Sequence, residues 1–150
     1  MAEQNISEAK KHLIFKLDNN EFGIDINKIT TIIEKDMNIT RVPKLPAFLK
    51  GVINLRGEII PVVSLRSRFG LAEDAYDEDT RIIIIKLDEF SAGIIVDSVA
   101  EVIELNEETT ENIANITGEH SLDYITGVGK VNERIITLLN LEKLVSLEEG

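Results

Sequence analysis

Leu13-Ile14-Phe15-Lys16-Leu17-Asp18 is followed seventy residues later by a second copy, Ile83-Ile84-Ile85-Lys86-Leu87-Asp88. The same shift continues without a gap and places Gly23-Ile24 on Gly93-Ile94. A shift of 76 then aligns the next segments, and the matched pairs are Gly51-Val52 with Gly127-Val128, Ile59-Ile60 with Ile135-Ile136, and Val62-Val63 with Leu138-Leu139. A repeat of this length is one supersecondary unit used twice, because its period is too long for a solenoid array.

The residues inside the repeat predict β-strands. Turn residues at Asp18-Asn19-Asn20 and Arg56-Gly57 predict antiparallel hairpins. Short β-branched runs bounded by Asp, Asn, Glu or Gly are typical of buried strands, and they cover residues 13–17, 82–87, 93–96 and 134–139. We therefore predict a mainly β fold of two similar small barrels with about five strands each. The first is expected in residues 12–71 and the second in residues 80–141, followed by a C-terminal helix over 141–148.

Two further segments carry structural predictions. Apolar residues recur at helical spacing in residues 26–33, as Ile26, Ile29, Ile32 and Ile33, which predicts a helix of about two turns lying on the sheet. The acidic, apolar-poor residues 72–79 are expected to join the barrels. Neither barrel is expected to be stable alone, since units of about 60 residues bury little surface.

The overall composition excludes several classes of protein. Of 150 residues, 43% are hydrophobic and 29% charged, as in one folded domain. No apolar run approaches the roughly 18 residues that span a bilayer, and no apolar signal segment opens the chain, so we expect a cytoplasmic protein without membrane insertion. The net charge of −11 repels phosphate backbones, which argues against a nucleic-acid partner. Because the chain has no cysteine, it has no thiolate metal site.

No catalytic motif accompanies the candidate reactive residues. His12 and His120 are each isolated in the sequence, which favours neither catalysis nor metal binding. Gly127-Val128-Gly129 lacks the third glycine of a dinucleotide loop, and the acidic residues 74–79 lack the spacing of a calcium loop. We therefore predict no enzymatic activity, cofactor, metal or small-molecule substrate.

Arg56 is the most informative charged residue. It stands at the tip of a predicted hairpin between two apolar strands, where Gly57 is free to adopt a positive φ. Arg56 is therefore expected to be exposed. One interpretation is that Gly57 makes the turn and Arg56 only aids solubility. The other is that the hairpin presents a planar, multi-donor cation to a partner of an otherwise acidic protein.

Residues 46–66, which run from Pro46 through Asn54-Leu55-Arg56-Gly57 to Leu65-Arg66, resemble the signature of the CheW family of chemotaxis coupling proteins. The similarity extends to residues 22–26, 93–99 and 124–127, so it covers nearly the whole chain. The resemblance implies two SH3-like five-stranded β-barrels packed side by side. It also implies a non-enzymatic adaptor that joins the regulatory domain of the histidine kinase CheA to the cytoplasmic tips of methyl-accepting chemoreceptors.

The resemblance further implies which residues contact partners. Receptor binding would use an apolar groove between the barrels together with Arg56, and the matching groove residues are Leu13, Ile26, Ile29, Ile32 and Val99. Kinase binding would use the first strand of the second barrel, through Arg81, Ile83 and Ile85. Asn54 and Gly57 would shape the turn. The competing interpretation assigns the groove residues to the core, in which case a fully buried residue is structural and a half-exposed one is a candidate contact.

Two departures and three alternatives remain at this stage. Ser64 stands where many members carry Asp, which bears on the cap of a short helix at 65–69, and Thr31 stands where Glu is common. The same domain occurs inside CheA and CheV, but no phosphotransfer segment, ATP-binding domain or receiver is expected here. The chain is alternatively a CheW-like domain that couples a different kinase or receptor system. A small β-barrel that binds a ligand or metal is the alternative from another class.

Overall fold

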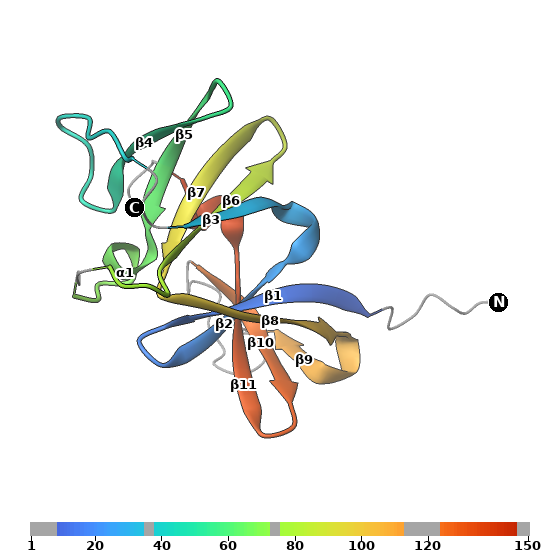
Figure 1. The fold of residues 1–150 in the computed structure, drawn as a ribbon. Helices are drawn as coiled ribbons and strands as arrows, with labels where there is room; N and C mark the ends of the chain where they lie inside the picture. Colours follow the sequence, from blue (N-terminus) through green and yellow to red (C-terminus); the bar gives the residue numbers. More distant parts are fainter. Residues whose placement is uncertain (1–8, 35–37, 73–75, 113–123, 147–150) are drawn as a thin grey trace.

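A computed structural model describes residues 9–34, 38–72, 76–112 and 124–146, and it is built almost entirely from β-strands (Figure 1). The first half contains β1 (Lys10–Leu17), β2 (Asn20–Asp25), η1 (Ile26–Lys28), β3 (Ile29–Glu34), β4 (Leu49–Leu55), β5 (Glu58–Ser64) and α1 (Leu65–Arg68). The second half contains β6 (Arg81–Leu87), β7 (Phe90–Val96), β8 (Ser98–Leu105), η2 (Glu107–Thr109), β9 (Thr110–Asn112), β10 (Ile125–Val131), β11 (Arg134–Leu139) and α3 (Leu141–Leu144). The mainly β fold predicted from the sequence is therefore confirmed.

The strands form two sheets that share one pairing order, apart from the additional strand β9 in the first sheet. One sheet has the order β8-β1-β2-β11-β10-β9, and the other has the order β3-β6-β7-β5-β4. Ile14 pairs with Gly23 in the first sheet, and their counterparts at the 70-residue shift, Ile84 and Gly93, pair in the second. Even the irregular registers agree, since β1 against β8 and β6 against β3 each carry a bulge at matching positions. The repeat seen in the sequence is thus a repeat of strand pairing.

The two sheets do not correspond to the two halves of the chain, which corrects the predicted boundaries at 12–71 and 80–141. The β1–β2 hairpin joins β8 to β11 of the second half, and the β6–β7 hairpin joins β3 to β5 of the first. The exchange is made by two parallel contacts, between β11 and β2 and between β5 and β7. A shift alignment shows which segments are alike, but it does not show on which sheet a hairpin docks, so the exchange was not visible in the sequence.

The helix predicted over residues 26–33 is wrong. Only Ile26–Lys28 form one 3-10 turn, which begins where the Asp25 carboxylate accepts a hydrogen bond from the Asn27 N–H at 2.9 Å. The following Ile29–Glu34 segment is an edge strand paired with β6, and its residues alternate between half-buried and exposed. Five of its six residues are isoleucine or threonine, a β-branched run that favours a strand over a helix. Thr31 consequently lies on a strand.

Both short helices are capped at equivalent positions. Ser64 Oγ accepts a hydrogen bond from the Ser67 N–H at 3.2 Å and so caps α1, which the sequence had placed at 65–69. Asn140 lies 76 residues further on and caps α3 by accepting from the Lys143 N–H at 3.2 Å. The helix expected over 141–148 is shorter than predicted, since α3 ends at Leu144 and residues 147–148 lie outside the described part.

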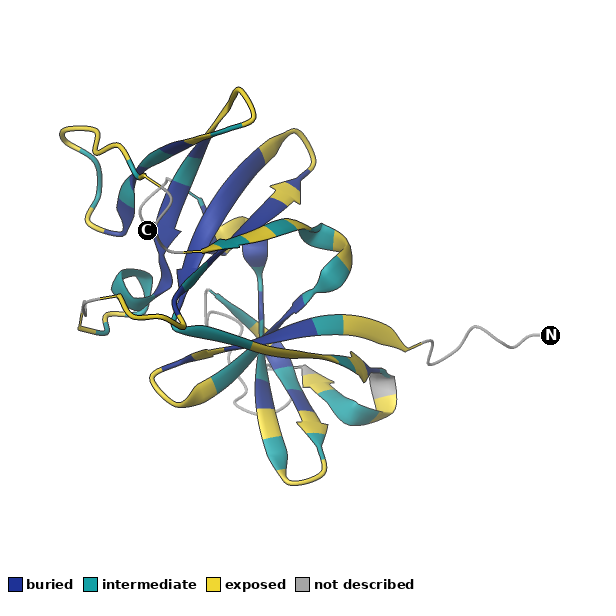
Figure 2. Cartoon of the chain, viewed as in Figure 1, coloured by how far each residue is buried: buried dark blue, intermediate teal, exposed yellow. Residues whose placement is uncertain are grey.

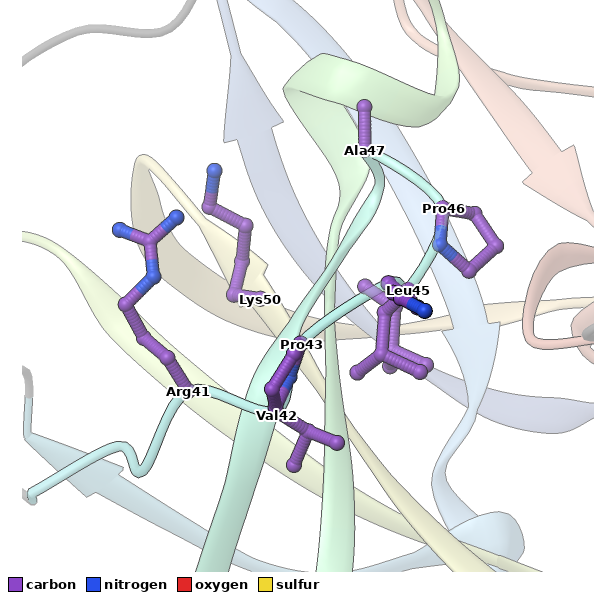
Figure 3. A pocket seen from close by; sticks show the side chains of 9 residues that line it. Arg41, Val42, Pro43, Leu45, Pro46, Ala47 and Lys50 are labelled. Carbon is purple, nitrogen blue, oxygen red and sulfur yellow. The ribbon is translucent and has the colours of Figure 1, made fainter.

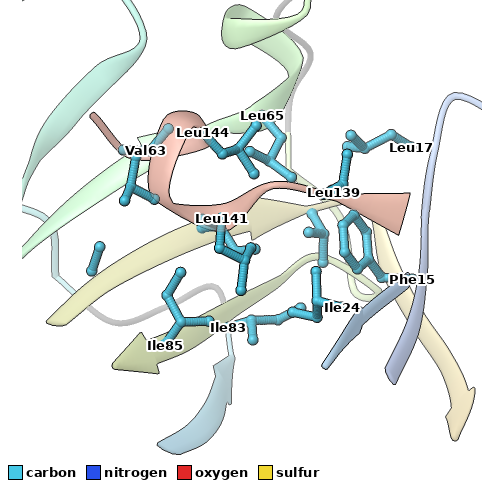
Figure 4. Packing of buried hydrophobic residues seen from close by; sticks show 14 of the residues in the cluster. Phe15, Leu17, Ile24, Val63, Leu65, Ile83, Ile85, Leu139, Leu141 and Leu144 are labelled. Atoms are coloured by element: carbon cyan, nitrogen blue, oxygen red, sulfur yellow. The ribbon is translucent and has the colours of Figure 1, made fainter. Parts of the chain in front are cut away.

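Burial is concentrated between the sheets and inside the barrel formed by the five-stranded sheet (Figure 2). Along β6, Ile82 and Ile84 face the barrel interior, whereas Ile83 and Ile85 face the other sheet. Strands buried on both faces read as continuous apolar runs, which explains the four consecutive isoleucines. Figure 4 shows α3 inserted into the same inter-sheet core, where Leu141 and Leu144 lie among side chains of both sheets.

Aromatic rings continue this core along the contact between the sheets. Phe15, Phe22, Phe69 and Tyr124 form a chain in which successive ring centroids are 5.6 to 5.8 Å apart. The Arg68 guanidinium lies over Phe48 at 3.8 Å and donates to the carbonyl oxygens of Lys143 and Ser146. Since α1 and α3 follow different sheets, these contacts hold the two sheets in one orientation. None of the described helices has the length and apolarity needed to cross a bilayer.

Candidate protein-binding surfaces

The β4–β5 hairpin presents Arg56 at a rigid, exposed tip. Arg56 and Gly57 have φ values of +56° and +87°, so both central residues of the turn are left-handed, as in the hairpin turns that match strand twist. The Asn54 side-chain oxygen accepts a hydrogen bond from the Gly57 N–H at 3.0 Å and closes the turn from within. The predicted exposure of Arg56 is confirmed, and Asn54 and Gly57 have the structural positions expected of them.

Two apolar side chains that sequence reasoning missed lie on the strands next to this tip. Ile59 on β5 is 60% exposed, and Phe90 at the start of β7 is also largely exposed. Val62 of β5 pairs with Gly93 of β7, and Ile59 and Phe90 each lie three residues before their member of this pair. Because side chains alternate along a strand, both point to the same face of the sheet. Exposed apolar neighbours of a cation are typical of the centre of a protein-binding surface. The sequence could have identified Ile59, because side chains alternate along β5 and Ile60 is buried, so Ile59 is directed outward.

The expected groove residues lie on the edge strands β3 and β8, in the turn η1 and on the interior strand β1. Ile29 on β3 and Val99 on β8 are half-buried and pack against the inter-sheet core from opposite sheets. Ile32 is 38% exposed, and Ile26 in η1 is half-buried. Leu13 is only 5% exposed, which places its side chain in the core. A buried residue is structural and a half-exposed one is a candidate contact. Four of the five residues therefore remain candidate contacts, and Leu13 has a structural role.

Val102 completes this set and was missed. It lies 70 residues after Ile32, it is 46% exposed, and it pairs with Leu13 as Ile32 pairs with Ile83. The internal repeat could have identified Val102, because every residue proposed on β3 has a counterpart on β8. We use the name seam edge for Ile26, Ile29, Ile32, Val99 and Val102.

The expected kinase-facing residues have different positions. Arg81 begins β6, is partly exposed and donates to the carbonyl oxygens of Glu78 and Thr80 at 2.7 and 2.8 Å. Ile83 and Ile85 are 0% exposed on a strand flanked by β3 and β7. A partner would have to open the sheet to contact these two side chains, so only Arg81 of the three lies on a surface. Sequence alone does not distinguish a strand buried on one face from one buried on both.

Two ion-pair networks stabilise the junctions around these surfaces. Arg66 of α1 donates to both Asp97 oxygens at 2.9 and 2.8 Å, and Asp97 also accepts from the backbone N–H of Asp18 at 2.9 Å. Burial raises the pKa of the Asp97 carboxyl, but these hydrogen bonds outweigh it, so the pKa lies below its ordinary value. The network ties α1 to the β7–β8 junction and the β1–β2 turn.

The second network crosses the six-stranded sheet. Arg134 on β11 donates to both Glu21 oxygens at 3.0 and 2.8 Å and lies 2.8 Å from a Glu101 oxygen. The hydrogen bond from Arg134 lowers the pKa of Glu21, and the same bonds raise the pKa of Arg134. The three strands β2, β8 and β11 are thereby linked at one end of the barrel.

The described residues form no metal-binding cluster. His12 Nδ1 lies 3.1 Å from the carbonyl oxygen of Lys10, and His120 lies outside the described residues. Within residues 9–34, 38–72, 76–112 and 124–146, no three His, Asp or Glu side chains converge in a way that suits a metal ion. What these residues offer is a rigid double barrel with exposed apolar and cationic positions.

Comparison with known proteins places the chain in a family. Residues 11–149 match the model of the CheW-like domain. Chemotaxis protein CheW of Klebsiella aerogenes is 39% identical over 141 residues, which cover 94% of this chain and 84% of that protein. Its namesake in Thermotoga maritima is 34% identical over 92% of this chain and 91% of its own. The crystal structure of the scaffolding protein TtCheW from Thermoanaerobacter tengcongensis superposes with a TM-score of 0.84 at 35% identity, covering 95% of this chain and 98% of the other. The chain therefore belongs to the family of CheW-like domains.

Proposed function

We propose that this chain is a non-enzymatic chemotaxis adaptor that couples the histidine kinase CheA to the cytoplasmic tips of methyl-accepting chemoreceptors. The observation that carries the proposal is the Arg56 tip, a cation fixed by the Asn54 hydrogen bond and flanked by exposed apolar residues. Relatives bearing the name chemotaxis protein CheW and the structural neighbour described as a scaffolding protein support the same role. The adaptor acts in the cytoplasm and reaches the membrane only through its receptor.

The receptor tip is assigned to the seam edge and Arg56. Half-exposed isoleucine and valine side chains from two sheets suit a helix that lays an apolar stripe along them. Arg56 adds a cation that engages carboxylates of the helix. The regulatory domain of the kinase is assigned to a separate surface at the start of β6, of which Arg81 is the accessible member.

The test is a pair of calorimetric titrations, one with the isolated regulatory domain of the cognate kinase and one with a soluble receptor-tip fragment. The unmodified chain is expected to bind each partner saturably with one-to-one stoichiometry. Arg56→Ala and Ile32→Glu are expected to weaken receptor-tip binding at least about tenfold, as loss of a contact near the centre of an interface does. Both variants are expected to leave kinase binding unchanged.

Ile135→Glu is the matched control, because Ile135 is an exposed isoleucine on β11 away from the seam edge. It is expected to bind both partners as the unmodified chain does, and melting curves confirm that each variant is folded. Absence of kinase binding up to high micromolar concentration would refute the kinase half of the proposal. Equal receptor binding by Ile32→Glu and Ile135→Glu would refute the assignment of the seam edge.

A further inference from the structure

The connection between β3 and β4 forms a pocket that the coupling function does not use. Its volume is about 320 Å³, and Figure 3 shows the side chains that line it. Three of the nine lining residues are cations and none is acidic; the nine are Arg41, Val42, Pro43, Lys44, Leu45, Pro46, Ala47, Leu49 and Lys50. The pocket is thus a local reversal of charge in a protein whose net charge is −11.

The stretch of sequence without acidic residues extends on both sides of the pocket residues. Residues 38–57 contain four cations and no acid, although 27 of the 150 residues of the chain are acidic. Such a stretch in an acidic protein attracts a negatively charged partner locally while the remaining surface repels it. The partner must therefore approach this connection and not the sheets around it.

The pocket is held in shape by its own backbone. Thr40 and Val52 exchange two backbone hydrogen bonds of 2.8 and 2.9 Å, and the Leu49 N–H donates to the Pro46 carbonyl oxygen at 3.0 Å. Leu49 is buried and Leu45 packs against the inter-sheet core, so the floor is continuous with the core of the molecule. Pro43 and Pro46 restrict φ at two further positions. A preformed site of this kind loses little entropy when it binds.

The lining indicates what the pocket holds. Six of the nine residues have apolar side chains, while polar atoms make up most of the accessible lining, which favours a negatively charged occupant that also carries an apolar side chain. Phosphate sites use convergent backbone N–H groups, often at a helix N-terminus, whereas two of these nine residues are prolines that have no N–H. The volume lies at the lower limit for cofactor and drug-sized sites, which suits inserted side chains better than a whole small molecule.

Two of the three cations lie on the same side of the pocket. Figure 3 shows Arg41 from the connection and Lys50 from β4 extending to the same side of the pocket, while Val42 and Leu45 lie toward its other side. From this arrangement we propose that the pocket binds an acidic peptide segment of a protein partner, with an apolar side chain seated on Leu45 and Leu49 and flanking carboxylates engaged by Arg41, Lys44 and Lys50. This inference does not rest on the kinase or receptor assignments.

The test follows backbone amide chemical shifts of the full chain during titration with a synthetic peptide. The probe is acetylated and amidated, with two central leucines flanked by glutamates, and a second peptide carries glutamine in place of every glutamate. The acidic peptide is expected to shift the amides of Val42, Leu45 and Leu49 saturably, and the neutral peptide is expected to bind at least about tenfold more weakly. The triple variant Arg41→Gln, Lys44→Gln and Lys50→Gln is expected to weaken acidic-peptide binding about tenfold, because three partly exposed ion pairs are lost.

A charge-matched control uses Lys10→Gln, Lys16→Gln and Lys86→Gln, three exposed lysines on β1 and β6, and it is expected to retain binding. Inorganic phosphate is the third ligand. Saturable binding of phosphate at the same amides with no preference for the peptide would overturn the proposal, and so would equal weakening by both triple variants or shifts confined to other parts of the chain.

Discussion

At the scale of single residues, two glycines decide how β4 and the turn that follows it are built. Gly51 has a φ of +148°, and a Cβ atom added there would overlap the backbone carbonyl of Thr40. Gly57 has a φ of +87°, but a Cβ atom there meets nothing within 4 Å. The two glycines are therefore required for different reasons, one for close backbone approach and the other for conformation alone.

This difference predicts unequal costs for the same substitution. Gly51→Ala is expected to lower the free energy of unfolding by about 3 kcal/mol or more, because the Thr40–Val52 bridge must move. Gly57→Ala is expected to cost only about 1 kcal/mol, the penalty of placing an L-residue in a left-handed conformation. Urea unfolding of both variants measures the two values. Equal costs would show that the Thr40 carbonyl does not constrain Gly51.

At the scale of elements, the Asp97 network makes the junction between α1, β7 and β8 sensitive to acid. The pKa of Asp97 is lower in the folded than in the unfolded chain, so the unfolded state binds more protons as the pH falls. The stabilisation is therefore complete above about pH 5, beyond the ordinary range of an aspartate, and is lost as the pH falls through the folded-state value. The pKa of Glu21 is also lowered, by its hydrogen bond with Arg134, so Glu21 contributes to stability with the same pH dependence.

Asp97→Asn is expected to be less stable than the unmodified chain by about 1 kcal/mol at neutral pH, since it loses charge-assisted hydrogen bonds that are partly open to solvent. The difference is expected to shrink between about pH 5 and pH 3, because the unmodified chain then loses the same contribution. Urea unfolding at a series of pH values measures both curves. A difference that stays constant with pH would refute the electrostatic role of Asp97.

Which elements were predictable from the sequence depended on how local their causes are. The hairpins at 18–20 and 56–57 and the short helix after Ser64 follow from residues within a few positions, and these predictions are confirmed. Residues 26–33 have isoleucines at helical spacing, but pairing of β3 with β6, about 50 residues away, decides their conformation. The burial of Ile83 and Ile85 likewise depends on layers contributed by distant segments.

The site divides in the same way. The Asn54-Arg56-Gly57 turn is local, and the sequence predicted its position and the exposure of Arg56. It did not predict the positive φ of Arg56 or the hydrogen bond from the Gly57 N–H to the Asn54 side chain. Four members of the seam edge, Ile26, Ile29, Ile32 and Val99, were named from the family resemblance. Only Val102 was missed, although the repeat offered it as the counterpart of Ile32. Ile59 and Phe90 lie on strands whose neighbours are set by the parallel contact of β5 and β7, which the sequence did not indicate.

At the scale of the whole molecule, the exchange of hairpins makes the two halves interdependent. Each sheet contains strands from both sides of the connection at residues 72–79. The inter-sheet core, the aromatic chain and the Arg68 contacts also combine residues from both halves. Neither half therefore contains a complete sheet.

Fragments 1–72 and 73–150 are accordingly expected to lack a cooperative unfolding transition when each is alone. An equimolar mixture is expected to recover the β-sheet circular dichroism spectrum of the intact chain and a cooperative transition, because the exchanged hairpins can pair between fragments. Independent folding of either fragment would contradict the exchanged topology and favour two contiguous barrels.

The central claim is that one rigid molecule presents separate surfaces to a kinase and a receptor. Sedimentation velocity of the chain mixed with both the kinase regulatory domain and the receptor-tip fragment tests it most directly. We expect a ternary species that contains all three proteins, and we expect Ile32→Glu to remove only the receptor fragment from it. Mutually exclusive binding, in which the receptor fragment displaces the kinase domain, would contradict the claim.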